Sequence, residues 1–324
     1  MSPTLALKQA VLFSLALVAG VPTAWADSWP TKPIQLIVVF PPGGSADQMG
    51  RLLAPHLSEK LGQNVVVENR SGAGGMIGTN FVSKGDDHTF GVVFDTHATN
   101  VHSLKETMPF DVMKDITYVS LLGTAPLAIF SNPKSGYTDF GKLIAASKKK
   151  TPVSYGTVGT GGLSHLAMVS LAKQGGFDWQ NIAYRGGGPM HTAVAANHVP
   201  IGIASLLAIK GLADGGTVIP LAVTTSKRSP IFPNVPTVAE SGYEGFEAPT
   251  WWGVVASRQT SEPIAQKMSE AIASVLRIPE VAAKLKSQGV EVAGTTPAQF
   301  RTFVQQQIDM WGKVIRENNI KAGD

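Results

Sequence analysis

Short apolar runs separated by glycine and proline turns recur in the first half of the chain after residue 30. Residues 34–40 (IQLIVVF) form an almost continuous apolar run, which is typical of a strand buried on both faces. Similar runs follow at residues 65–67 and 89–94, with helical stretches between them. This alternation of strands and helices predicts a parallel sheet covered by helices.

The first predicted helix has sequence signals for both its start and its end. Apolar residues recur at helical spacing over residues 49–61, and Gly62 is placed to end the helix. Ser45 stands three residues before Gln48, a spacing that predicts a capping box. We therefore expect a helix that begins directly after the glycine-rich turn of residues 41–44.

The same pattern restarts in the second half of the chain. Residues 153–155 predict a strand, residues 156–162 (GTVGTGG) a glycine-rich turn, and residues 163–173 a helix. Further strands are expected at residues 182–184, 200–204 and 218–223, and helices over most of residues 261–318. The two halves share one architecture, which predicts an α/β fold with two lobes.

The first 26 residues have the pattern of a secretory signal peptide. Lys8 is the only charge before Asp27, an apolar core follows at residues 10–21, and Ala24 and Ala26 form an A-x-A cleavage signature. The core is too short to span a bilayer, which takes about 20 residues of helix. We predict cleavage after Ala26 and export, which would separate the protein from cytoplasmic ATP and nicotinamide cofactors.

Composition and charge exclude several classes of protein. Of the 324 residues, 44% are apolar and 15% charged, which suits two domains with their own cores and excludes a disordered chain. A net charge of +4 is too small for a nucleic-acid-binding surface. Because the sequence has no cysteine, disulfides, thiolate nucleophiles and zinc–thiolate sites are excluded.

Sequence motifs of catalysis and metal binding are missing. The chain has no G-x-S-x-G, H-E-x-x-H or Walker A motif, and its seven histidines lack the spacing of a helical metal site. We expect no catalytic residue, no metal and no cofactor. One alternative is an exported nicotinamide-dependent oxidoreductase. Residues 72–78 are one residue off a dinucleotide fingerprint, and Asp95 is placed for a ribose. The other interpretation is a backbone turn with positive φ.

Two glycine-rich turns, one in each half, stand directly before predicted helices. Residues 42–47 (PGGSAD) and 160–165 (TGGLSH) place backbone N–H groups at helix N-termini, which attract anions without a basic side chain. Ligands of open α/β sheets bind at the carboxyl ends of the strands, where both turns lie. Two facing lobes could therefore hold both ends of a small dianion, or share one carboxylate.

The motifs around these turns resemble those of a known family. YGTVGTGGLSHLAM, YRGGGPMHTAV, LAVTTSKRSPIFPNVPTVAESGYEGFEAPTWWGVVAS and the opening segment WPTKPIQLIVVFPPGGSADQMG are similar to tripartite tricarboxylate transporter receptors, also called Bug proteins. The resemblance covers nearly all of the mature chain. It implies a periplasmic solute-binding protein, not an enzyme, that closes two lobes on an organic acid and delivers it to a membrane permease.

The resemblance also implies how the chain is divided. Residues 27–125 and 250–324 are expected to form the first lobe, and residues 126–249 the second. Crossings near residues 118–130 and 248–256 would act as hinge strands. We expect a monomer without a nucleic-acid partner.

Carried over position by position, the resemblance places the ligand between the lobes. On one wall it implies Phe40, Ser45, Ala46, Asp47 and Thr96. On the facing wall it implies Thr157, Thr160, Ser164, His165, Arg185 and Ser205. Two roles stay open for Arg185, a carboxylate partner or a structural ion pair. His165 is expected either to donate to the ligand or to cap its own turn.

Departures from the family pattern bear on the ligand. Residues 86–91 (DDHTFG) stand where many relatives have DGYTLL, and residues 192–200 (TAVAANHVP) lack two acids that relatives often carry. The less acidic second lobe disfavours a ligand with an ammonium group. FGVVFDTHATN and MHTAVAANHVP resemble members that serve aromatic dicarboxylates such as terephthalate, whose ring would pack near Phe40. The alternatives are an aliphatic di- or tricarboxylate for transport or sensing, and an interaction protein without a small ligand.

Overall fold

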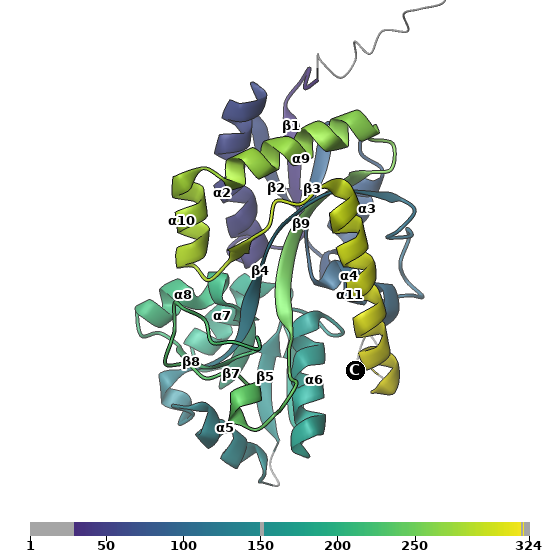
Figure 1. Ribbon diagram of the computed structural model, residues 1–324. Helices are drawn as coiled ribbons and strands as arrows, with labels where there is room; N and C mark the ends of the chain where they lie inside the picture. The colour runs from purple at the N-terminus through teal and green to yellow at the C-terminus, as the bar shows by residue number, and fades with distance from the viewer. Residues whose placement is uncertain (1–28, 150–151, 319, 321–324) are drawn as a thin grey trace, which may run out of the picture.

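The computed structural model of the chain describes residues 29–149, 152–318 and 320 (Figure 1). The predicted signal peptide and its cleavage after Ala26 lie outside these residues. Within them, no helix is both long and apolar enough to cross a membrane. The described chain forms the predicted two-lobed α/β fold, in which each lobe has a sheet flanked by helices.

The first lobe is built on a sheet whose first three strands are parallel. β1 (Ile34–Val38) lies between β2 (Val65–Asn69) and β3 (Thr89–Phe94), and β9 (Pro249–Ser257) joins β3 in the antiparallel direction. β1 and β3 are almost entirely buried, which explains their nearly continuous apolar sequences. All three predicted strands of this half are confirmed.

The helices of this lobe follow its strands. They are α2 (Ser45–Leu61), the 3-10 turn η1 (Ala73–Gly75), α3 (Met76–Ser83) and α4 (Thr96–Ser103). α2 ends as predicted, because Gly62 adopts a left-handed φ of 68° and donates its N–H to the Ser58 carbonyl. The predicted capping box is wrong. Gly44 is the N-cap without a capping side chain, and the Ser45 hydroxyl accepts a hydrogen bond from the Trp252 indole at 3.1 Å.

The long strand β4 (Ile116–Ser131) belongs to both sheets. Its residues 116–126 pair with β9 in the first sheet, and residues 127–131 pair with β7 (Ile201–Ser205) and β8 (Ile219–Val223) in the second. Figure 1 shows β4 and β9 running side by side through the middle of the molecule. Both strands lie at the predicted crossings, near residues 118–130 and 248–256, and their role as hinges stays a prediction.

The second sheet has the order β4–β7–β5–β6, with β8 also paired to β4. β5 (Val153–Thr157) is parallel to β6 (Trp179–Ala183) and to β7. β6 begins earlier than predicted because Trp179 pairs with Val153 and packs against Tyr155. The helices of this lobe are α5 (Phe140–Ser147), α6 (Leu163–Gly175), α7 (Gly187–Ala195) and α8 (Leu206–Asp214), with 3-10 turns η2 (Pro133–Ser135) and η3 (Ala239–Ser241).

The C-terminal elements return to the first lobe. They are α9 (Glu262–Leu276), α10 (Pro279–Ser287), β10 (Glu291–Val292), which pairs with β4, and α11 (Pro297–Glu317). α11 begins with a full capping box at Thr296. Phe300 of this helix lies in the core of the first lobe, whereas Trp311 and Ile315 lie in a core of the second. Because α11 contributes to both cores, the expected residue bounds of the lobes stay a prediction.

Candidate ligand-binding site

A narrow cavity lies where the two lobes face each other. Its first-lobe wall consists of Phe40, Gly44, Ser45, Ala46 and Phe94. The rest of the wall is mostly apolar and consists of Leu127, Val158, Ser164, Gly187, His191, Ile203, Ala204, Ser205 and Ala208. No Asp, Glu, Lys or Arg of the described residues is in this lining. A charge on a ligand must therefore be stabilised by backbone groups, hydroxyls and one imidazole.

Four helices bring their N-termini to this cavity. α2 contributes residues 44–46, α6 contributes Ser164, α7 contributes Gly187, and α8 starts directly after Ser205. None of these helices has a side chain that caps its N-terminus. The N–H groups of a first helical turn lack intrahelical partners and carry a partial positive charge. The cavity is thus suited to an anion although no cationic side chain lines it.

Five of the residues expected at the ligand line the cavity. They are Phe40, Ser45, Ala46, Ser164 and Ser205. Phe40 follows β1, and Ser45 and Ala46 open α2, whereas Ser164 lies in the first turn of α6 and Ser205 ends β7. Both glycine-rich turns recognised in the sequence therefore reach the same cavity from opposite lobes.

Asp47 lies beside the cavity but does not line it. Its carboxylate accepts hydrogen bonds from the Gly43 N–H at 3.1 Å and from the Arg51 guanidinium and Asn69 amide at 2.9 Å. Burial would raise the pKa of Asp47, but these hydrogen bonds outweigh burial and lower the pKa below its usual value. The carboxylate thus fixes the turn that carries the cavity residues, instead of facing the cavity.

Two expected residues of the second lobe have partners inside the protein. The Thr157 hydroxyl donates to the Asn181 side-chain oxygen at 2.6 Å. His165 Nδ1 accepts a hydrogen bond from the Gly161 N–H at 3.0 Å, so this histidine caps its own turn, which is one of its two expected roles. Neither residue lines the cavity. Both shape the loop that leads from β5 into α6.

The remaining expected residues lie outside the cavity. Thr96 and Thr160 line a second pocket, which shares Val158 with the cavity. They would meet a ligand only if it extended past Val158. Arg185 is exposed, is absent from the cavity lining and makes no salt bridge within the described part of the chain. Neither role expected of Arg185 is seen in this conformation.

Sequence reasoning missed His191, which is 6% exposed and lines the cavity from α7. Its Nε2 has no hydrogen-bond partner among the described residues, and the same is true of the Ser205 hydroxyl. Burial lowers the pKa of His191 to about 4, so the imidazole is uncharged at neutral pH. The signal lies in GGGPMHTAV, a third glycine-rich turn that opens a helix.

An aromatic cluster forms the first-lobe side of the cavity. The rings of Phe40 and Phe94 meet edge to face, with centroids 5.7 Å apart, and Phe94 lies 6.2 Å from the Trp252 ring. Trp252 also donates to the Ser45 hydroxyl. The hinge strand β9 therefore supports both the apolar wall and the start of α2.

The glycine-rich turn after β2 is a backbone turn and not a dinucleotide site. Gly72, Gly74 and Gly75 have φ of 137°, 61° and 91°. Asp95, the expected ribose partner, is 2% exposed and accepts a hydrogen bond from the Thr250 hydroxyl of β9. Burial raises the pKa of Asp95 to about 8. A buried, protonated carboxyl cannot reach a ribose, so the dinucleotide interpretation is wrong.

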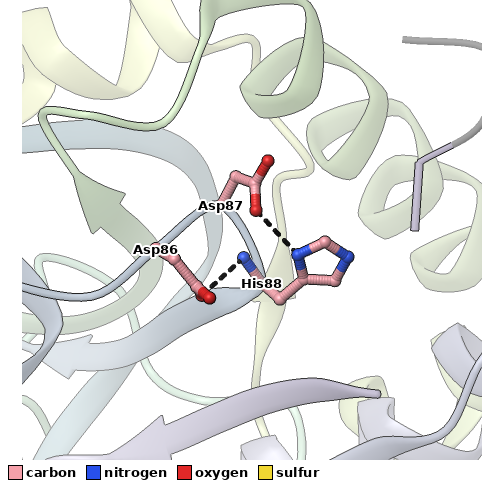
Figure 2. A group of neighbouring side chains, drawn as sticks. All are labelled: Asp86, Asp87 and His88. Atoms are coloured by element: carbon pink, nitrogen blue, oxygen red, sulfur yellow. Dashed lines mark hydrogen bonds and ion pairs between the residues drawn. The ribbon is translucent and has the colours of Figure 1, made fainter. Parts of the chain in front are cut away.

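Asp86, Asp87 and His88 form a group with the spacing of a metal site, since one ligand atom from each lies within 4.8 Å of the others (Figure 2). The imidazole is already engaged on both sides. His88 Nδ1 lies 2.7 Å from the Asp87 carboxylate, and Nε2 accepts the Thr31 N–H at 3.0 Å. Because Nε2 accepts, the ring proton is on Nδ1 and is donated to Asp87. No ring nitrogen is left for a metal.

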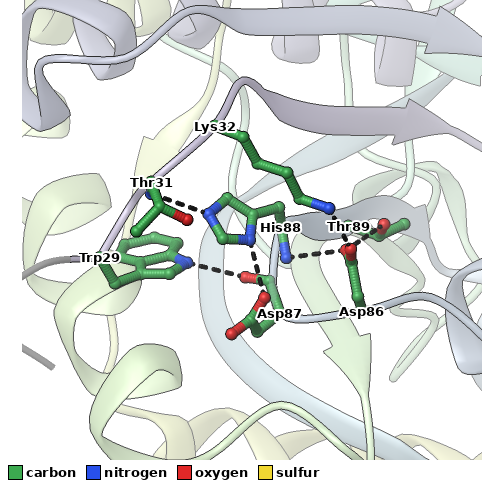
Figure 3. A network of polar contacts seen from close by, with 7 residues as sticks. All are labelled: Trp29, Thr31, Lys32, Asp86, Asp87, His88 and Thr89. Atoms are coloured by element: carbon green, nitrogen blue, oxygen red, sulfur yellow. Dashed lines mark hydrogen bonds and ion pairs between the residues drawn. The ribbon is translucent and has the colours of Figure 1, made fainter. Parts of the chain in front are cut away.

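The surrounding network connects the start of the described chain to β3 (Figure 3). Asp86 accepts from the Lys32 ammonium at 2.6 Å, and this hydrogen bond is the main cause that lowers the pKa of Asp86. The Trp29 indole donates to the Asp87 carbonyl at 2.9 Å. We interpret the group as a structural clasp that holds the start of the described chain against β3.

Comparisons with known proteins find relatives over most of this chain. The profile of the tripartite tricarboxylate transporter family receptor matches residues 49–320. Protein BugT of Bordetella pertussis is 35% identical over 300 residues, which cover 91% of this chain and 92% of that protein. An R. palustris protein solved with adipate is 33% identical with a TM-score of 0.87 and covers 90% of this chain and 99% of its own. The periplasmic binding protein BugD is 28% identical with a TM-score of 0.86, at the same coverage.

The matched range, the identity and the shared two-lobed fold support one conclusion. The relatives are solute-binding receptors of the periplasm and not enzymes. This chain has the corresponding two-lobed fold, with a cavity between the lobes. It belongs to the tripartite tricarboxylate transporter receptor family and is a solute-binding receptor.

Proposed function

We propose that this receptor binds an organic carboxylate in the cavity between its lobes and delivers it to the membrane permease of a tripartite tricarboxylate-type transporter. The observation that carries the proposal is the meeting of four uncapped helix N-termini around an apolar cavity without a charged side chain. A carboxylate accepts several charge-assisted hydrogen bonds from such N–H groups.

The ligand that suits this cavity best is an aromatic dicarboxylate such as terephthalate. Phe40 and Phe94 offer an apolar aromatic wall, and burial of a ring against them contributes roughly 25 cal/mol per Å². The starts of α2 and α7 lie against each other, since a Cβ added to Gly187 would lie 3.4 Å from the Gly44 Cα. We propose that one carboxylate lies at the start of α2 and the other at the start of α8, next to Ser205.

An aliphatic dicarboxylate is the second candidate. The observation that favours it is the relative solved with adipate, which shares 33% of its sequence with this chain. The cavity is narrow, and a flexible chain enters such a space with less separation of the lobes than a flat ring needs. The two candidates differ in the shape of the group between the carboxylates.

The mechanism is closure about β4 and β9. In this conformation the turn after β1 packs directly on the glycine-rich turn before α7, where a Cβ added to Gly188 would lie 2.8 Å from the Pro42 carbonyl oxygen. A ligand shifts the equilibrium toward this closed state only through contacts that it makes better there. We propose that the permease recognises the closed receptor, a monomer exported by a signal peptide that is cut after Ala26.

Thermal unfolding of the mature chain, from Asp27 onward, tests the proposal. Citrate, succinate, adipate, benzoate, phthalate, isophthalate and terephthalate are compared with NAD as a control. A ligand at 100 times its dissociation constant stabilises the fold by about 2.7 kcal/mol. We expect terephthalate to raise the melting temperature and phthalate to leave it unchanged, because the carboxylates of phthalate lie side by side instead of at opposite ends of the ring.

Each pattern of shifts has a definite meaning. A shift with aliphatic acids alone keeps the carboxylate receptor and overturns the aromatic ligand. No shift with any acid overturns the carboxylate receptor itself.

A further inference from the structure

Two buried polar atoms on the second-lobe side of the cavity lack partners. They are His191 Nε2 and Ser205 Oγ, on residues that are 6% and 2% exposed. A buried polar atom without a hydrogen bond is destabilising, and most such atoms in proteins are paired. Both atoms belong to residues that line the cavity, where a ligand would supply the missing partner.

The surroundings of these atoms restrict what the partner can be. His191 lies against Phe130, with ring centroids 6.1 Å apart, and a Cβ on Gly187 would lie 3.2 Å from the imidazole. Burial keeps the imidazole uncharged. The positive potential on this side therefore comes from the starts of α7 and α8. Hydroxyl, imidazole and helix N-termini together suit a carboxylate that accepts from several neutral donors.

We propose that His191 and Ser205 hold the second carboxylate of a dicarboxylate whose first carboxylate lies at the start of α2. The inference rests on the proposed function and deepens it, because it names the residues that distinguish a diacid from a monoacid. A monoacid bound at α2 leaves both atoms unpaired, whereas a diacid pairs them. His191 is thus a specificity-determining residue.

The test measures the ratio of dissociation constants for terephthalate and benzoate by isothermal titration calorimetry, with adipate and hexanoate as a second pair. His191→Leu and Ser205→Ala are compared with the wild type. The control variant is His198→Leu, because His198 is exposed at the turn after α7. We expect each cavity variant to lower the preference for the diacid about tenfold or more, with benzoate affinity within twofold of the wild type and the control unchanged.

Folding does not obscure this test. Ser205 is the N-cap of α8 but makes no side-chain capping bond, so Ser205→Ala removes no hydrogen bond of the folded protein. Its melting temperature without ligand is expected to match that of the wild type. If His191→Leu did not fold, Ser205→Ala would decide the question alone.

The failure of this inference differs from the failure of the proposed function. If the wild type binds diacids and both variants keep its preference for them, the inference is overturned and the carboxylate receptor stands. If the wild type binds neither these four acids nor any other acid of the unfolding panel, the proposed function fails. A variant that loses diacid and monoacid affinity equally contradicts a role in discrimination.

Discussion

The buried carboxyl of Asp95 should make the stability of this receptor depend on pH. This carboxyl lies at the end of β3 with one oxygen on the Thr250 hydroxyl of β9, and its other oxygen has no partner in the described structure. Asparagine has the same shape and does not ionise. The substitution Asp95→Asn therefore removes the ionisation and keeps the neighbouring hinge strand in place.

The expected size follows from the change in pKa on folding. An unfolded aspartic acid ionises near 3.8, and burial raises the pKa of Asp95 to about 8. One pKa unit corresponds to about 1.36 kcal/mol. At pH 7 the unfolded chain releases a proton that the folded chain keeps, which costs the folded state about 4 kcal/mol. Because the folded pKa is the higher one, stability is fully present below pH 4 and is lost as the pH rises toward 8.

Chemical denaturation at pH 4.5 and pH 7.5 measures this dependence. We expect Asp95→Asn to be more stable than the wild type by several kcal/mol at pH 7.5, with most of the gain absent at pH 4.5. Asp178→Asn, at an exposed site, should behave as the wild type at both values. An equal effect of Asp95→Asn at both pH values would refute the reasoning, because the change in stability would then not depend on ionisation of the carboxyl.

Three further predictions concern closure and the fixed turns. Gly188→Ala should weaken ligand binding at least tenfold, because its Cβ would lie 2.8 Å from the Pro42 carbonyl oxygen in the closed state. Calorimetry would compare it with Gly211→Ala, where nothing lies within 4 Å, and equal affinities would contradict the closed contact. Asp47→Ala should lower the free energy of unfolding at pH 7 by about 1–3 kcal/mol, because it removes a buried carboxylate that accepts hydrogen bonds from Gly43, Arg51 and Asn69. Since the folded pKa of Asp47 is lowered, its stabilisation is lost as the pH falls, so denaturation at pH 3 should show a smaller difference. His88→Ala should reduce stability by about 1–3 kcal/mol but leave ligand affinity unchanged, and unfolding with and without ligand would show whether the clasp is only structural.

The sequence predicted elements whose signals are local. β3 and the C-terminal end of α2 appear where the apolar run and Gly62 placed them. The resemblance implies a crossing strand at β4, and the pairing of this one strand in two sheets agrees with it. Such features depend on short stretches of chain, where burial and backbone conformation leave little choice.

The sequence could not predict partners that come from distant residues. The sequence predicts Ser45 as a helix cap, but its hydroxyl accepts a hydrogen bond from the Trp252 indole, more than 200 residues later. Asp47 looked available to a ligand, but Asn69 and Arg51 surround its carboxylate. No sequence signal singles out His191 itself, because only the packing of α7 against the first lobe brings it into the cavity. In each case tertiary contacts decide what the side chain meets.

The helix α11 has a consequence for the unfolding of the whole receptor. Its first turns pack in one core through Phe300, and its last turns pack in the other through Trp311. His102 of α4 also bonds the Ile308 carbonyl at 3.0 Å, midway along the helix. Unfolding of either lobe would therefore remove the packing contacts of one half of α11. Calorimetry should record a single cooperative transition for both lobes. A ligand held between the lobes should raise the melting temperature of that one transition.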